Sequence, residues 1–269
     1  MLTPDGDREV ILGIPGQMRL LDSASDGRVL FSRSEARAGI RCLAPGEATE
    51  QELPGLDFSD VNDMTSDGRK ILLSEFGEAG GLNSWSVYLQ DTDGTPAVRL
   101  AEGQGLALSP DGGRALTFDL SDPPQIVIRP TGAGEPLLLV NPGFTGFSGG
   151  DWHPDGDRVV FVATAGGASR IYIQDLDGGA PEALTPEGVY AGFGERIISP
   201  DGKWIQGKPN QVYEIRLSDG ETSLWKDLNH PDPAGVLTYW GLQVSDDEQS
   251  YCYSYMRNLS SLYLVEGLR

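Results

Sequence analysis

The chain has 269 residues and is rich in turn-forming types, with 36 glycines and 18 prolines. This size and composition fit one closed all-β domain. They exclude a protein built from transmembrane helices, because no run approaches about 18 apolar residues. Forty acidic residues against twenty basic ones give a formal net charge of −20, so electrostatic repulsion argues against nucleic acid and anionic membrane surfaces as partners.

The N-terminal segment is predicted to contain a β-strand at residues 8–14 (REVILGI). Residues 1–14 lack the basic region and the long apolar region of a signal peptide, so the sequence itself shows no export signal. The compartment stays open, since the chain is also compatible with the extracytoplasmic part of a longer, membrane-anchored protein.

From the N-terminus onward, one pattern recurs six times: an apolar run, a Ser or His, an Asp at a turn, and a second apolar run. The turn aspartates are Asp26, Asp67, Asp111, Asp155, Asp201 and Asp246. Their successive spacings are 41, 44, 44, 46 and 45 residues. A period of this size is typical of one four-stranded blade of a β-propeller.

The third repeat, LALSPDGGRALTF, shows the physical basis of the pattern. Residues 106–109 favour an extended strand, Pro110 presets a turn, and Asp111 and Gly112 supply the side-chain acceptor and the permissive backbone that a tight turn needs. Residues 114–118 then return as the second strand. A second hairpin follows in most repeats, so each unit predicts four antiparallel strands.

We therefore expect an all-β, six-bladed β-propeller forming a single domain over residues 1–269. The last repeat offers only three strands, so residues 8–14 are predicted to complete it and to close the ring. The predicted blades span residues 18–55, 56–101, 103–140, 144–185, 190–226, and 236–268 plus 8–14.

Two cysteines, Cys42 and Cys252, lie in the first and last repeats, which are neighbours in a closed ring. A disulfide and two buried thiols are both compatible with this placement. The sequence favours two buried thiols and indicates no compartment.

The SPDG-type turns and apolar strands resemble the TolB-type, PD-repeat β-propellers over nearly the whole chain. Three segments (14–33, 73–112 and 253–269) are also similar to the C-terminal propeller region of bacterial, notably acidobacterial, eukaryotic-like serine/threonine kinases. This resemblance implies a sensor or interaction module, with a kinase domain in a longer parent chain. The last repeat departs from the pattern, because it has Asp246-Asp247 in place of Asp-Gly.

Patterns that suggest catalysis do not fit their structural context. The GFSGG segment at residues 146–150 matches a nucleophile elbow, but it leads into a blade strand rather than a helix. The two histidines and two cysteines have no zinc-site spacing, and no phosphate-binding loop is present. We therefore expect no enzymatic activity, no cofactor and no metal site.

A binding site is instead expected at the mouth of the channel, where the loops between the second and third strands meet the connections between blades. The Asp-Gly turns, at the other ends of the strands, are too similar to one another to discriminate a partner. The mouth loops also carry acids, among them Asp60 and Glu75. The predicted site residues are Arg19, Phe144, Phe147, Phe193, Tyr239, Trp240, Arg257 and Asn258.

The function that follows is a non-enzymatic binding or sensor module that holds a protein or small ligand at the mouth. Two alternatives stay open: the gating propeller of a prolyl-oligopeptidase-type peptidase, and a calcium-dependent, lactonase-like propeller enzyme. Fold-level analogy does not choose among them.

Overall fold

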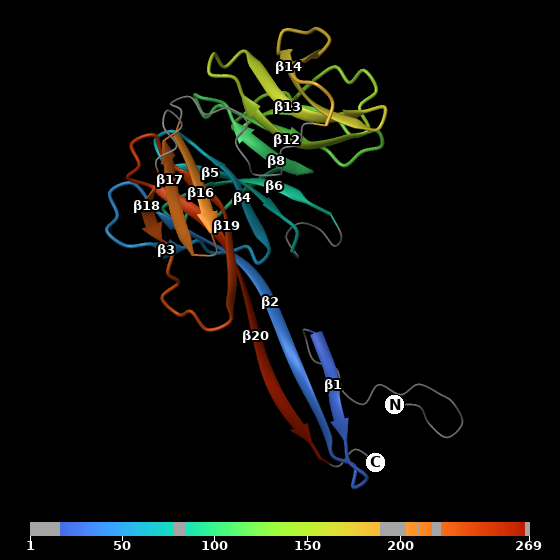
Figure 1. The fold of residues 1–269 in the computed structure, drawn as a ribbon, viewed down its shortest axis with the longest axis vertical. Helices are drawn as coiled ribbons and strands as arrows, with labels where there is room; N and C mark the ends of the chain where they lie inside the picture. The colour runs from blue at the N-terminus through green and yellow to red at the C-terminus, as the bar shows by residue number, and fades with distance from the viewer. Residues whose placement is uncertain (1–16, 78–83, 189–202, 209, 217–221, 267–269) are drawn as a thin grey trace, which may run out of the picture.

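The computed structural model describes residues 17–77, 84–188, 203–208, 210–216 and 222–266, and these residues form an all-β structure. The described part contains twenty strands in five sheets whose ladders are antiparallel. Four sheets pack in a body, and the fifth runs from that body into a long arm (Figure 1).

Three sheets of the body have four strands each, and every strand pairs with the next one along the chain. They correspond to the second, third and fourth predicted repeats and confirm the four-stranded antiparallel unit for them. Their strands are β4 (Ser59–Met64), β5 (Lys70–Glu75), β6 (Ser86–Asp91) and β7 (Val98–Glu102); β8 (Gln104–Leu108), β9 (Arg114–Phe118), β10 (Ile126–Pro130) and β11 (Leu137–Leu138); and β12 (Gly146–Trp152), β13 (Arg158–Ala165), β14 (Ala168–Asp175) and β15 (Glu182–Ala183).

The fourth sheet has three described strands, β16 (Lys203–Lys208), β17 (Gln211–Arg216) and β18 (Thr222–Asp227), paired in chain order. It belongs to the fifth predicted repeat. The first strand and the turn of that repeat, at residues 190–202, lie outside the described residues.

The repeat turns hold their shape through the aspartate side chain. In four of them Oδ1 of the aspartate accepts the backbone N–H two residues further on, at 3.1 Å for Asp26 and at 3.0 Å for Asp67, Asp111 and Asp155. The residue after the aspartate has a positive φ, as at Gly112 (68°), where glycine avoids a steric penalty.

In the last repeat, the aspartate that holds the turn lies one residue later than the sequence predicts. Asp247, not Asp246, accepts the Gln249 N–H at 3.0 Å and the Ser245 hydroxyl at 2.7 Å. Glu248 takes the glycine position with a φ of 59°. A side chain there is strained, which is the physical cost of lacking Asp-Gly.

The predicted first and last blades do not form two separate sheets. They merge into one sheet of β1 (Gln17–Ser23), β2 (Val29–Leu43), β3 (Gln51–Glu52), β19 (Val236–Val244) and β20 (Tyr251–Val265). The strands β2 and β20 pair at all fifteen positions, from Val29↔Val265 to Leu43↔Tyr251. Both strands continue through residues 33–37 and 257–258, which were expected to lie in loops between second and third strands, because neither segment carries a proline or an Asp-Gly pair.

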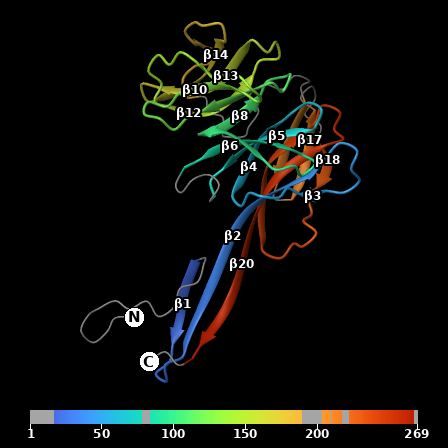
Figure 2. The same cartoon turned by 180° about the vertical axis from the view of Figure 1, so that it is seen from behind.

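The outer halves of β2 and β20, together with β1, form the arm that projects from the body (Figures 1 and 2). Residues 261–265, which were predicted to pair with residues 8–14, pair with residues 29–33 of β2. The segment 8–14 lies outside the described residues. Five sheets rather than six blades are thus present in the described part of the chain.

The hydrophobic core lies between neighbouring sheets. One cluster combines Leu106 and Phe118 with Phe147, Trp152 and Phe161, and therefore joins the sheet of β8–β11 to that of β12–β15. Another, which includes Ile40, Val61 and Cys252, joins the inner part of the β2–β20 sheet to β4 and β5.

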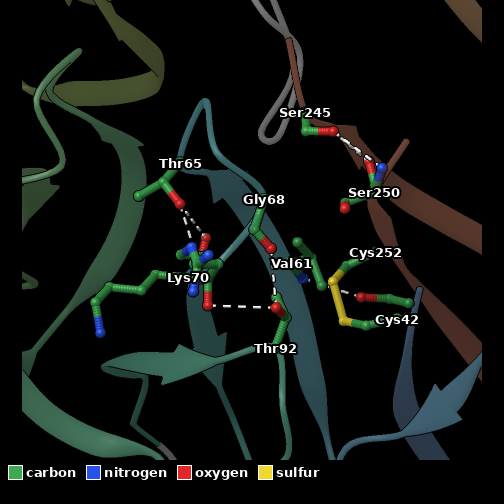
Figure 3. Close-up of a disulfide and its surroundings, with 11 residues drawn as sticks. Cys42, Val61, Thr65, Gly68, Lys70, Thr92, Ser245, Ser250 and Cys252 are labelled. Atoms are coloured by element: carbon green, nitrogen blue, oxygen red, sulfur yellow. Dashed lines mark hydrogen bonds between the residues drawn. A yellow bond between two sulfur atoms is a disulfide. The ribbon is translucent and has the colours of Figure 1, made fainter. Parts of the chain in front are cut away.

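A disulfide links Cys42 and Cys252, which face each other in the β2–β20 ladder with a Cα–Cα distance of 4.1 Å. The expectation of two free thiols is therefore wrong. Both cysteines are buried beside Val61 of β4, as Figure 3 shows. The full-length pairing of β2 with β20 aligns them, and that pairing was not visible from the repeat spacing.

We predict that Cys42→Ala with Cys252→Ala lowers the free energy of unfolding by about 2–5 kcal/mol, because the crosslink spans 210 residues and restricts the unfolded chain. Urea unfolding with and without reductant measures this. The double variant should give the same curve in both conditions, and the parent protein should approach it when reduced. A parent curve that reductant leaves unchanged would contradict the prediction.

Candidate binding site at the base of the arm

Four of the predicted site residues come together where the arm leaves the body. Tyr239 and Trp240 lie on β19, and Arg257 and Asn258 lie on the paired strand β20. The register places Tyr239 opposite Tyr255, so the four residues form one region of a two-stranded ladder. The sequence placed these residues on separate loops, and the ladder now brings them side by side.

The loop of residues 228–235, between β18 and β19, covers this region and is anchored by it. The Arg257 guanidinium donates to the Ala234 carbonyl at 2.8 Å and forms an ion pair with Asp232. The backbone N–H of Asn258 donates to the Gly235 carbonyl at 2.9 Å. The hydrogen bond from Arg257 is the main reason that the pKa of the Asp232 carboxyl lies below its ordinary value.

Two buried polar atoms in this region have no hydrogen-bond partner within the described residues: Nε2 of His230 and Oδ1 of Asn258. The His230 side chain accepts the Asp232 N–H at Nδ1 (3.1 Å), so the neutral ring carries its proton on Nε2. His230 is 8% exposed and its ring packs 4.7 Å from that of Tyr255. The region therefore holds one unused donor and one unused acceptor, which is rare for buried groups.

Trp240 joins this region to the neighbouring sheet. Its indole N–H donates to Oδ1 of Asp60 on β4 at 2.8 Å. The Ser254 hydroxyl, on β20 opposite Trp240, accepts the Val61 N–H at 2.9 Å. Burial raises the pKa of the Asp60 carboxyl to about 6, and the hydrogen bond from Trp240 only partly offsets that effect.

Glu75, which the sequence placed on an exposed mouth loop, is fully buried at the end of β5. It accepts the Phe58 N–H at 3.0 Å, the Gly77 N–H at 2.8 Å and the Ser59 hydroxyl at 2.5 Å. Burial is the largest influence on its carboxyl and raises its pKa. These contacts give Glu75 a structural role in holding the end of the β4–β5 hairpin.

The remaining predicted site residues do not join the region. Phe144 and Phe147 are buried, at 3% and 9% exposed, and pack edge-to-face on Phe161 in the core between two other sheets. Their placement at a binding surface is therefore wrong, because both rings pack in the core. Arg19 lies exposed on β1 in the arm. Phe193 lies outside the described residues.

A pocket of about 460 Å³ opens on the side of the Asp-Gly turns, where the sequence predicted no site. It lies between the turns of the second and third repeats and the turn that follows β2. Its acids Asp67 and Asp111 accept hydrogen bonds from within their own turns, and Lys70 pairs with Asp91. These polar groups therefore bond to other parts of the chain and stabilise the turns.

His230 is the functional candidate that sequence reasoning missed. It stood out only as one of two histidines, and the NHPDPAG segment around it indicates a turn rather than a site. Within the described residues, no group of three His, Cys, Asp or Glu side chains could hold a metal ion. The same residues contain no helix that is long and apolar enough to cross a membrane.

Comparison with known proteins gives structural similarity without a family assignment. No protein-family model matches the chain, and no curated protein matches it. It is similar to TolB from Acinetobacter baumannii (TM-score 0.45, 14% identity, 98% of this chain and 61% of that one). It is also similar to an oligogalacturonate lyase from Vibrio parahaemolyticus (0.45, 10%, 91% and 97%) and to the β-propeller domain of the Trilobed protease from Pyrococcus furiosus (0.41, 15%, 93% and 83%).

The chain thus spans less than two thirds of the TolB chain that it matches. All three TM-scores are below 0.5 and all three identities are below 25%, so these similarities identify neither a family nor a function for this chain.

We predict that Asp60→Asn removes a pH-dependent part of the stability. The raised pKa means that the folded state holds this proton more tightly than the unfolded state, so the free energy of unfolding falls as the pH rises through 6. The parent protein should gain about 1.4 kcal/mol from this group between about pH 7.5 and about pH 5. Asparagine keeps an oxygen for the Trp240 N–H and does not titrate.

Urea unfolding of both proteins at the two pH values measures the difference. Burial also raises the pKa of Glu75, with the same sign, but that group is present in both proteins and cancels in the comparison. Equal pH dependence in the parent protein and the variant would contradict the prediction.

Proposed function

We propose that this chain is a non-enzymatic binding module that recognises a peptide segment at the base of the arm. The observation that carries the proposal is the pair of unsatisfied buried atoms, Nε2 of His230 and Oδ1 of Asn258, on two segments held together by the Arg257 contacts. Buried polar atoms without partners cost about 1–3 kcal/mol each, so a ligand that satisfies them, once the 228–235 loop moves to admit it, recovers that free energy.

A peptide group has the chemistry that both atoms require. Its carbonyl oxygen accepts a hydrogen bond from the Nε2–H of His230, and its N–H donates to Oδ1 of Asn258. An extended segment of a partner protein offers such groups repeatedly, and recognition through main-chain groups is a common mode of peptide binding. The Tyr239 and Tyr255 rings beside them supply apolar contact.

The acidic charge of this chain favours a basic peptide segment as the ligand. The chain carries a net charge of −20, and Asp232 at the edge of the region is 62% exposed at its side chain. A cationic side chain of the ligand can pair with this carboxylate in competition with Arg257. Salt should then weaken the association by screening.

We also propose that the module serves as the sensor or interaction region of a longer signalling protein, outside the cytoplasm. The buried Cys42–Cys252 disulfide supports this location, since disulfides persist mainly in oxidising compartments. The resemblance to propeller regions that follow a kinase domain is the reason for choosing signalling over the peptidase and lactonase alternatives.

The test is a selection from a displayed library of random peptides on the full chain, followed by affinity measurement for one selected peptide. His230→Asn keeps an acceptor for the Asp232 N–H and removes the Nε2–H donor. Asn258→Leu removes the acceptor without changing the size of the side chain greatly. We predict that each variant weakens binding about tenfold and leaves the free energy of unfolding equal or higher, because it removes an unsatisfied buried group.

The matched control is Leu138→Ala on the outer strand β11, where the side chain is 60% exposed and far along the chain from the site. It should bind the peptide like the parent protein. Selected peptides that bind both site variants at full affinity would refute the proposed site. A chain that selects no peptide would refute the proposed function.

A further inference from the structure

The arm exposes apolar residues that a free monomer would be expected to bury. Leu20 and Leu21 on β1 are 65% and 46% exposed, and Leu262 and Leu264 on β20 are 66% and 56% exposed. In the second repeat, Val61, which the turn alignment places at the position of Leu20, and Ile71–Leu73 are fully buried between sheets. The arm is thus a sheet built from a blade-like repeat without the neighbouring sheet that covers such repeats in the body (Figure 2).

The strand β1 is also an open edge. In the described part of the chain it pairs with β2 alone, and all seven of its residues are exposed. An uncovered edge presents unpaired N–H and carbonyl groups that can extend the sheet with another strand. Natural edge strands often carry charged side chains that prevent pairing with other strands. In β1 the charged residues have an order that permits such pairing.

The order Arg19-Leu20-Leu21-Asp22 is complementary to itself when a second copy of the strand runs antiparallel to it. A two-fold axis between Leu20 and Leu21 places Arg19 of each copy opposite Asp22 of the other, and Leu20 opposite Leu21. In a regular strand residues 19 and 22 would lie on opposite faces. A β-bulge between Leu20 and Asp22 places them on the same face, because Arg19 pairs with Ser32 and Asp22 with Leu30. Opposite charges and apolar residues directly across an antiparallel pair are both stabilising.

The distribution of charge over the molecule favours contact at this place. Residues 17–36 and 258–265, which make up the arm, contain three arginines and three carboxylates, so the whole charge of −20 lies elsewhere. Phe31, beside the proposed axis, is seven residues from Ala38, where the body begins, which is about 23 Å of strand. That length is nearly three times the screening length of about 8 Å at physiological salt, so the acidic bodies stay apart while the arms meet.

We propose that two copies of this chain associate through their arms, by antiparallel pairing of the two β1 strands into one continuous sheet with reciprocal Arg19–Asp22 ion pairs. The symmetry is closed, so association ends at the dimer. The paired edge is short, so the dimer should be weak and should dissociate on dilution in the micromolar range.

Sedimentation velocity of the full chain over a range of micromolar concentrations tests the proposal. The parent protein should shift from monomer to dimer. In the Arg19→Glu variant, the new carboxylate of each copy faces Asp22 of the other copy, so the dimer contains two repulsive pairs. This repulsion should raise the dissociation constant of the dimer at least about tenfold. Arg19→Glu combined with Asp22→Arg reverses both partners and should restore the dimer. Both side chains are exposed, so neither variant disturbs folding.

Three outcomes would overturn the proposal. A parent protein that remains monomeric throughout the range has no such contact. A dimer that Arg19→Glu leaves intact is held elsewhere. Growth beyond the dimer into filaments would show that β1 pairs with a different edge, such as the outer part of β20, because head-to-tail pairing does not close.

Discussion

The antiparallel pairing of β2 with β20 is the constraint on which the rest of this structure depends. It brings the first and last described strands into one sheet, and the inner part of that sheet packs on β4 through Val61, Trp240 and Ser254. The disulfide, the contacts of the 228–235 loop and the arm all follow from the same ladder. Without this pairing, Arg257 and Asn258 would lie on a hairpin turn and would not anchor the Ala234–Gly235 segment.

Local chemistry made the four-stranded antiparallel units predictable from the sequence. Three complete four-stranded units follow from Asp-Gly turns flanked by apolar runs, because the turn residue, its side-chain acceptor and the strand pattern lie within a few residues of one another. The sixth turn was assigned one residue too early, since two adjacent aspartates offer the same acceptor, and the Ser245 hydroxyl and the Gln249 N–H both bond to Asp247.

The joining of the chain ends was not predictable in the same way. Pairing between residues more than 200 positions apart leaves no local signal, so the repeat pattern alone suggested two separate blades and two free thiols. The sequence also singled out only some of the residues that lie in the candidate site. Tyr239, Trp240, Arg257 and Asn258 were identified as mouth residues, whereas Phe144 and Phe147 carry the same aromatic signal and lie in the core. Composition does not separate a ring that packs from a ring that binds.

The same ladder determines how the molecule would respond to a pulling force applied through its two ends. Tension would first pull β1 away from β2. Because Val29 and Val265 are paired near the outer tip of the arm, it would then separate β2 and β20 one residue pair at a time, until it reached Cys42–Cys252. There the covalent bond would carry the load, and the residues between the two cysteines would feel none of it. The arm is therefore an extensible element in series with a mechanically protected body. Asn258 pairs with Ala36, six residue pairs outside the disulfide, so it would be pulled away from the protected Asp60 before the load reached Cys42–Cys252.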